Sequence, residues 1–223
     1  MSASQQNKSR TQNLLIPGEV GQLQARLTRP GASRLNRADD PVHETAWVVL
    51  SHPHPQYGGT MDNKVVTTLE RTFQQLGYGT LAYNFRGVQE SAGDYDEGMG
   101  EQYDLKAVVD WLRREQSVEE LTLAGFSFGS YVSLAQADEL GAKRLCTVAP
   151  PVSLYDLSGL HPQADWLLIQ GGRDEVVEPK EVLDWALTRE TVPDLLWRAQ
   201  AGHFFHRQLV WLKQILLGHY GQP

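Results

Sequence analysis

The chain has 223 residues, 41% of them hydrophobic, which suits one compact domain and is too short for two well-built ones. A net charge of -7, with no block of lysine or arginine, excludes an electrostatic nucleic-acid binder. The single cysteine, Cys146, excludes an intrachain disulfide, and no apolar signal core or membrane-length apolar run is present, so we expect a cytoplasmic protein.

The first part of the chain predicts a tail and then the antiparallel start of a sheet. Residues 1–13 are rich in serine, glutamine and asparagine and are expected to be a flexible tail, followed by a single domain over residues 14–223. Residues 14–16 and 20–28 are expected to pair as strands at the sheet edge. Residues 29–44 contain two prolines and a glycine and are expected to form a polar loop.

From residue 47 onward, short apolar runs alternate with helix-compatible runs. The expected strands are 47–51, 79–84, 121–124, 144–149, 165–171 and 195–199, and the expected helices are 63–76, 101–115, 131–140, 179–189 and 204–217. This alternation predicts an α/β fold with a mostly parallel sheet covered by helices on both faces. Only residues 150–164 separate two late strands, which is too short for a cap domain.

A Gly-x-Ser-x-Gly pattern, residues 125–129, lies between the expected strand 121–124 and the helix that follows it. In this context the pattern is typical of the nucleophile elbow of an α/β-hydrolase, where a tight turn exposes the serine hydroxyl. Gly125 and Gly129 would let the strand and the helix pass closely. Ser127 is therefore the candidate nucleophile.

Candidate partners for Ser127 follow in the chain order that this fold requires. Asp174 comes just after the expected strand 165–171, and His203 lies in a glycine-bearing loop after the last strand. Other residues compete for these roles. Asp165 and Glu175 are the alternatives for the acid, and His206 is the alternative for the base.

Acyl transfer needs two backbone N–H donors aimed at the developing oxyanion, and Phe128, directly after the serine, would supply the first. The second should come from the loop that begins at His52. Because its two prolines lack an N–H, His54 is the first candidate and Tyr57 the second. His52 and His54 could also form half of a metal site, but the loop offers no further ligands, so we expect His52 to order the loop and no metal to bind.

Arg86 and a group of carboxylates form a second charged constellation. They allow an anion or metal site, but a loop-fixing ion pair is the commoner outcome and is the one expected here. The carboxylates are Asp94, Asp96, Glu101 and Asp104.

Together these motifs resemble compact, lidless bacterial α/β-hydrolases, similar in size to dienelactone hydrolases and described as carboxylesterases or serine-aminopeptidase-like hydrolases. The resemblance covers residues 14–218 and rests on the His-Pro-His-Pro and Gly-Gly-Thr-Met segments, the Asn-Lys-Val-Val and Asn-Phe-Arg-Gly-Val segments, the elbow, Gly-Arg-Asp at 172–174 and Gly-His-Phe-Phe-His at 202–206. It implies an open site with esterase-type activity on Ser127, Asp174 and His203. True dienelactone hydrolases carry a cysteine in the elbow, so serine argues against that substrate.

The sequence thus predicts a serine hydrolase that cleaves small carboxylic esters or thioesters without a cofactor. Two alternatives stay open, namely an acyltransferase or perhydrolase with the same triad, and a catalytically silent binding protein. We expect neither a nucleic-acid nor a membrane partner, and a homodimer is compatible with the sequence. The side chains expected to grip the acyl group are Tyr57, Val152, Tyr155 and Phe204.

Overall fold

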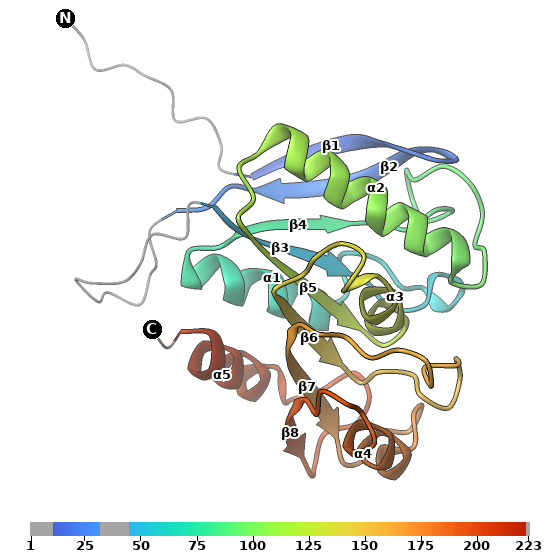
Figure 1. Cartoon of the computed structure of the whole chain (residues 1–223), viewed down its shortest axis with the longest axis vertical. Coiled ribbons are helices and arrows are strands. Elements are labelled where there is room, and N and C mark those ends of the chain that lie inside the picture. Colours follow the sequence, from blue (N-terminus) through green and yellow to red (C-terminus); the bar gives the residue numbers. More distant parts are fainter. Residues whose placement is uncertain (1–10, 32–44, 222–223) are drawn as a thin grey trace, which may run out of the picture.

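The computed structural model describes residues 11–31 and 45–221. Eight strands form one sheet in the order β1-β2-β4-β3-β5-β6-β7-β8 (Figure 1). The strands are β1 (Thr11–Gly18), β2 (Gly21–Thr28), β3 (Ala46–Ser51), β4 (Gly79–Tyr83), β5 (Glu120–Phe126), β6 (Arg144–Val148), β7 (Asp165–Gly171) and β8 (Asp194–Arg198). The helices are the short 3-10 helix η1 (Pro55–Tyr57), α1 (Lys64–Leu76), α2 (Met99–Glu115), α3 (Phe128–Gln136), α4 (Pro179–Leu187) and α5 (Leu209–Tyr220).

The sheet is antiparallel at one edge and parallel over the rest, as the sequence predicts. Strand β2 pairs antiparallel with both β1 and β4, whereas every pair from β4–β3 to β7–β8 is parallel. Strand β1 begins at Thr11, earlier than residue 14, where the sequence predicts that structure begins. The rest of the expected tail, and most of the expected loop 29–44, lie outside the described residues.

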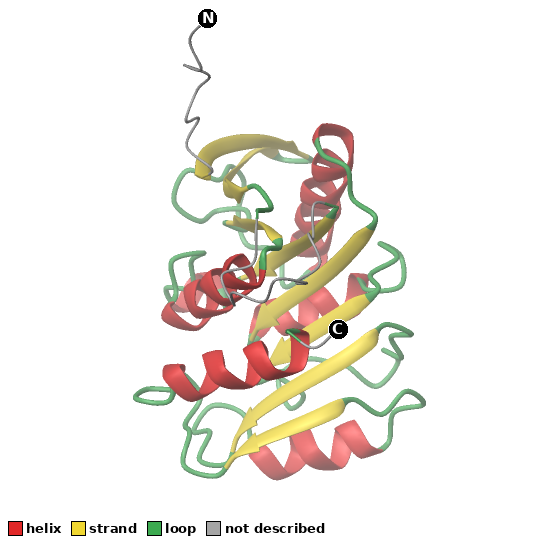
Figure 2. Ribbon diagram, turned by 90° about the vertical axis from the view of Figure 1, so that its left-hand side faces the viewer, coloured by secondary structure: helices red, strands yellow, loops and turns green. Residues whose placement is uncertain are grey.

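Helices cover both faces of the sheet (Figure 2). One core cluster joins a face of the sheet to helices α2, α3 and α4 through side chains such as Val108, Val132 and Val182. The other joins the opposite face to α1 and α5 through Leu69 and Leu212. Since both faces are buried, the central strands consist almost entirely of buried residues, which explains why most of their residues are apolar.

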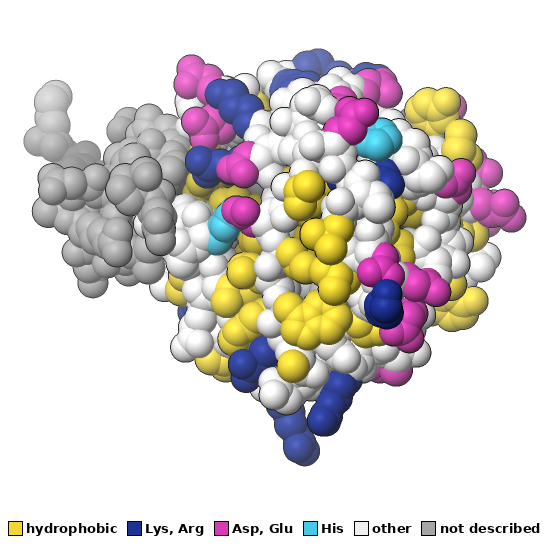
Figure 3. Space-filling model, turned by 60° about the horizontal axis from the view of Figure 1, so that its bottom comes forward, with side chains coloured by type: hydrophobic (Ala, Val, Ile, Leu, Met, Phe, Trp, Pro, Cys, Tyr) yellow, Lys and Arg dark blue, Asp and Glu magenta, His cyan; other side chains and the backbone are white. Residues whose placement is uncertain are grey.

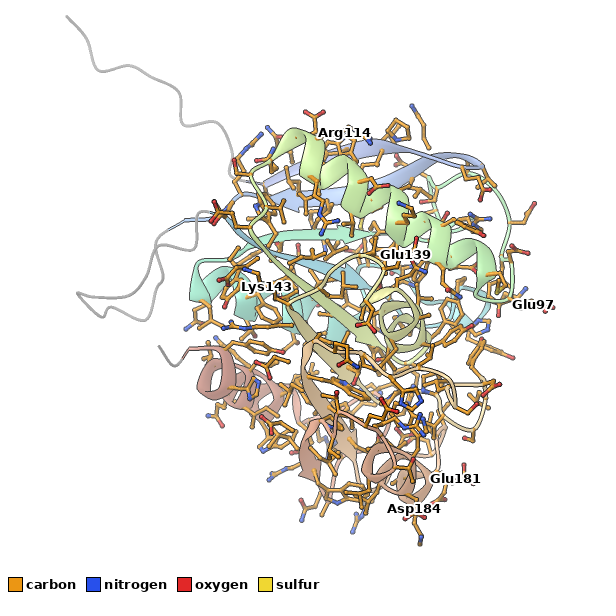
Figure 4. All side chains as sticks on the ribbon, viewed as in Figure 1. Glu97, Arg114, Glu139, Lys143, Glu181 and Asp184 are labelled. Atoms are coloured by element: carbon orange, nitrogen blue, oxygen red, sulfur yellow. The ribbon has the colours of Figure 1, made fainter. Side chains whose placement is uncertain are left out.

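The outer surface is charged over the helices and more apolar at one end. Charged side chains such as Arg114, Glu139 and Asp184 lie at the surface on or beside the helices (Figure 4). The end formed by β8 and α4, brought forward in Figure 3, shows hydrophobic side chains among charged ones, and the exposed Leu187 and Trp197 belong to these two elements. Among the described residues, no helix combines the length and hydrophobicity needed to cross a bilayer.

Two helix boundaries differ from the sequence prediction, and both affect the site. Helix α3 begins at Phe128, directly after Ser127, rather than at residue 131. Helix α5 begins at Leu209 rather than at residue 204, because Phe205 and Arg207 have positive φ angles of 51° and 60° and cannot continue a helix. Residues 203–206 are therefore a loop, free to turn toward the serine.

No helix or strand forms between β6 and β7, as expected from the short connection. The segment that would carry a cap in a larger hydrolase is a loop of turns along the sheet edge. The C-terminal edge of the parallel strands is therefore shaped by loops. In open α/β sheets this is the edge where ligands bind.

Candidate active site

Ser127 occupies a strained turn between β5 and α3. Its φ and ψ angles are 54° and -119°, a combination that non-glycine residues rarely adopt. Such strain costs about 1–3 kcal/mol and persists only where the surroundings impose it. Here the Ser127 N–H donates to the Val148 carbonyl of the neighbouring strand at 2.8 Å. The turn brings the hydroxyl to the end of the sheet.

The two glycines of the pattern are needed for close packing, as the sequence predicts. A Cβ atom on Gly125 would overlap the backbone carbonyl of Gly129. A Cβ atom on Gly129 would overlap the carbonyl of Ser51, at the end of β3. Helix α3 therefore starts almost in contact with two strands, and larger residues at either position would push it away from the sheet.

Three candidate side chains meet at this edge. The Ser127 Oγ lies 3.0 Å from His203 Nε2, and His203 Nδ1 lies 2.9 Å from Asp174 Oδ2 and 3.1 Å from Asp174 Oδ1. All three residues are buried. They come from the loops after β5, β7 and β8, so the parallel sheet brings together residues that are 76 and 29 positions apart in sequence.

The Asp174 carboxylate is held in its ionised form by several donors. The N–H groups of Val176 and Val177 donate to Oδ1 at 2.9 and 2.8 Å, and Gln170 Nε2 donates to Oδ2 at 3.1 Å. Burial is the largest single influence on the Asp174 pKa and raises it, but the hydrogen bond and charge of His203 and the backbone donors together lower the pKa below its usual range. An ionised Asp174 can fix His203 with Nδ1 protonated and Nε2 free to accept from Ser127.

The competing residues occupy other places. Asp165 lies at the start of β7, and thus at the opposite end of the strand from Asp174. Glu175 turns its carboxylate to the His203 backbone, whose N–H donates to Oε2 at 3.1 Å. His206 is exposed and its ring stacks on Phe204, with centroids 5.8 Å apart.

The loop after β3 distinguishes the two candidates for the second oxyanion donor. The Tyr57 N–H donates to the His54 carbonyl at 3.2 Å, and the N–H groups of Gln56, Gly58 and Gly59 also have partners within the loop. Among the described residues, the N–H of His54 has no hydrogen-bond partner, and neither has the N–H of Phe128. Both residues line the same cavity as Ser127. The hydrogen bonding favours His54 over Tyr57.

His52 orders this loop, as expected, through both of its ring nitrogens. Nδ1 donates to the Pro53 carbonyl at 2.6 Å, and Nε2 accepts from the Phe85 N–H at 3.0 Å. Neither nitrogen is then available to a metal ion. Burial lowers the pKa of His52 to about 4, against a smaller upward effect of the Pro53 carbonyl. The ring is therefore neutral at pH 7.

The neutral His52 predicts a loss of stability in acid. Its pKa is about 4 in the folded protein and about 6.5 in an unfolded chain, so protonation favours unfolding. The neutral His52 contributes about 3 kcal/mol to the free energy of unfolding. This contribution is fully present above pH 6.5 and is lost as the pH falls through about 4. Urea denaturation should show that the free energy of unfolding decreases between pH 7 and pH 4. This decrease should be smaller in His52→Gln. An equal decrease in that variant would contradict the assignment.

A cavity of about 310 Å³ opens beside Ser127. Three of the four side chains expected to grip a substrate line it, namely Tyr57, Tyr155 and Phe204. The fourth expectation was wrong. Val152 does not line the cavity, and its partly buried side chain packs against the core cluster that includes residues of α2, α3 and α4. The other lining residues are Pro53, His54, Gly58, Gly59, Asn63, Ser127, Phe128, Pro151, Leu154, Val176 and His203.

Arg86 forms the expected ion pair and lies outside this cavity. Its guanidinium donates to both Asp104 oxygens, with distances of 2.9–3.1 Å, and its backbone N–H donates to the same carboxylate. Glu101 accepts from the N–H groups of Asp96 and Gly98 and so holds the turn before α2. The group fixes the loop after β4. Among the residues described, no three His, Cys, Asp or Glu side chains are arranged to bind a metal ion.

Sequence reasoning missed several residues of the site. Gln170 supports Asp174, and its signal was a buried polar residue in an otherwise apolar strand. Leu154 and Val176 line the cavity in place of Val152. Tyr95 contacts the Tyr155 hydroxyl at 3.1 Å, a pairing across 60 residues that no local pattern reveals.

The doubly covered parallel sheet with a strained serine elbow at its C-terminal edge defines the class of an α/β serine hydrolase. A family model described as X-Pro dipeptidyl-peptidase (S15 family) matches residues 21–163. The chain therefore belongs to this S15 family, and among α/β serine hydrolases it is similar to proteins that have no lid.

Three relatives illustrate the similarity. A lidless α/β serine hydrolase from Xanthomonas campestris is 40% identical, with a TM-score of 0.87 over 95% of this chain and 94% of that one. An α/β serine hydrolase homologue from Coxiella burnetii is 39% identical, with a TM-score of 0.85 over 93% and 96% of the two chains. An uncharacterized protein of Rickettsia prowazekii is 35% identical over 161 residues, which span 68% of this chain and 65% of that protein.

Proposed function

We propose that the protein hydrolyses small carboxylic esters through an acyl-enzyme on Ser127. The observation that carries the proposal is the continuous hydrogen-bonded chain from Ser127 Oγ through His203 to Asp174, at the mouth of an apolar cavity. A serine hydroxyl is a weak nucleophile on its own and needs an adjacent base that is itself oriented by a third group.

In the proposed mechanism His203 Nε2 takes the Ser127 proton as Oγ attacks the ester carbonyl. The N–H groups of Phe128 and His54 stabilise the oxyanion, and Asp174 stabilises the imidazolium. His203 then gives its proton to the leaving alcohol as the C–O bond breaks. A water molecule deacylates the enzyme by the same steps, with His203 again acting as the base.

The S15 family model raises a peptidase as the second candidate, and the cavity allows the two to be weighed. An enzyme that releases dipeptides must recognise a free terminal ammonium group, which calls for a carboxylate. Of the described residues that line the cavity, none is Asp or Glu. This lining, which is mostly apolar and aromatic, favours an ester whose acyl group is uncharged. Rates on butyrate esters and on aminoacyl-prolyl anilides, compared at equal concentration, test the choice, and faster cleavage of the anilides would overturn it.

The size of the cavity predicts a preference for short acyl chains. Its 310 Å³ lies at the lower end of small-molecule sites, and several lining side chains, such as Tyr57 and Leu154, are largely exposed. Each methylene group adds about 0.8 kcal/mol only where it is buried, so long chains gain little. We expect kcat/KM to be higher for acetyl to butyryl esters than for esters of ten or more carbons. A series of 4-nitrophenyl esters measures this, and a clear preference for dodecanoyl esters would contradict it.

A further inference from the structure

A second hollow of about 350 Å³ continues from the catalytic cavity. The two hollows share Gly58, Asn63 and Phe204 as lining residues. The two hollows therefore adjoin at these three residues. The remaining lining residues of the second hollow are Thr60, Asp62, Lys64 and His206.

The second hollow differs from the first in its chemistry. Lys64 is exposed, and within the described part of the chain its ammonium has no hydrogen bond or ion pair. The ring nitrogens of His206 likewise have no partner there, while the ring itself rests on Phe204. The nitrogen atoms of Lys64 and His206 therefore border the hollow and have no hydrogen-bond partner among the described residues.

Asp62 is the acidic residue among the described residues that line the hollow. Its Oδ1 accepts from the Arg26 guanidinium at 2.7 Å and not from Lys64, and the same guanidinium also pairs with Glu70 at 2.8 Å. Helix α1 begins at Lys64, so the positive end of a 13-residue helix lies at the same place. The helix N-terminus and the Lys64 ammonium, which forms no ion pair with a described residue, would therefore both attract an anion bound in the hollow.

The position of the hollow relative to His203 indicates which part of an ester it would receive. The leaving oxygen must lie within reach of His203 Nε2, because that atom returns the proton. Phe204 follows His203 directly, and its ring contacts the imidazole with centroids 5.1 Å apart. The hollow lies on this Phe204 and His206 side, whereas Leu154 and Tyr155 line the catalytic cavity only.

We propose that this second hollow, which we call the Lys64 subsite, binds an anionic group, a carboxylate or a phosphate, on the alcohol portion of the substrate. The inference rests on the proposed esterase function and narrows its substrate class. The acyl part would lie in the apolar cavity and the charged alcohol against Lys64 and His206. An ion pair with an exposed lysine contributes little free energy, so we expect kcat/KM to favour an anionic ester by up to about fivefold.

A matched pair of esters tests the subsite. The 3-(carboxymethyl)phenyl and 3-(carbamoylmethyl)phenyl butyrates share the acyl group and differ in charge at a position insulated from the ester by a methylene. We expect the ratio of kcat/KM for the anionic over the neutral ester to exceed one, to fall about fivefold in Lys64→Gln, and to shrink as NaCl screens the charge. Lys213→Gln, the same change at an exposed lysine of α5 outside both hollows, should keep the wild-type ratio.

Binding to a variant that cannot turn over separates this inference from the proposed function. Calorimetry on Ser127→Ala with the product 3-hydroxyphenylacetate should show tighter binding than with 3-hydroxyphenylacetamide, and the difference should vanish when Lys64→Gln is added. If both esters are hydrolysed and the ratio of their kcat/KM values is the same in wild type and Lys64→Gln, the subsite is overturned and the esterase proposal stays intact. Equal binding of the two products would have the same meaning. Failure to hydrolyse either ester, with selective binding of the anion retained, would overturn the esterase proposal instead.

Discussion

Replacing Ser127 with alanine should lower kcat for butyrate esters by about 10⁵- to 10⁶-fold, because the substitution removes the atom that forms the acyl-enzyme. The fold should survive, since within residues 11–31 and 45–221 the Ser127 side chain makes no hydrogen bond apart from the one to His203. Steady-state kinetics with a thermal melt of the same sample measures both effects.

Ser133→Ala is the matched control for this variant. Ser133 lies on the same helix, α3, and its buried hydroxyl has no hydrogen-bond partner among the described residues. Its loss should change neither rate nor stability by much. Substantial activity in Ser127→Ala, at a level within tenfold of the control, would show that another group is the nucleophile.

Asp174→Asn should lower kcat by as much as about 10⁴-fold. The amide can donate a hydrogen bond to His203 Nδ1, which would leave the proton on Nε2, the atom that must accept from Ser127. The backbone donors of Val176 and Val177 can still hold the remaining oxygen, so the loop should keep its shape.

Glu175→Gln gives the comparison, because it makes the same chemical change at the neighbouring residue. A glutamine oxygen can still accept from the His203 N–H, and we expect a loss of less than tenfold. If the two variants exchanged these effects, Glu175 rather than Asp174 would be the acid of the site.

Much of the site could be predicted from the sequence because its residues sit where the chain changes structure. Ser127, Asp174 and His203 each follow a short apolar strand, and strand ends in a parallel sheet share one edge. The glycines beside Ser127 carry a second local signal, since only they fit the close approach of α3 to the strands. Such features depend on a few adjacent residues and can therefore be recognised in a single sequence.

The parts that could not be predicted depend on packing between distant segments. The segment after β6 has no periodicity, so the sequence could not show that Leu154 faces the cavity while Val152 faces the core. The pattern at residues 204–217 suits a helix, yet positive φ angles at Phe205 and Arg207 delay it to Leu209. The choice of His54 over Tyr57 required the hydrogen bonds of the whole loop.

The Lys64 subsite illustrates the same division. Lys64 belongs to a sequence segment that suggested family resemblance but no role. Its significance depends on the approach of the loop after β8, which brings Phe204 and His206 to the start of α1. Lys64 and His206 are 142 positions apart in the sequence, and they border one hollow only after the sheet has formed.

The central claim is that Ser127 is an activated nucleophile, and covalent labelling tests it most directly. The protein should react with a fluorophosphonate at one site, and mass spectrometry of the digested adduct should locate the phosphonyl group on Ser127. Labelling should be lost in Ser127→Ala and retained in Ser133→Ala. A protein that stays unlabelled while folded, or an adduct located on any other residue, would contradict the account.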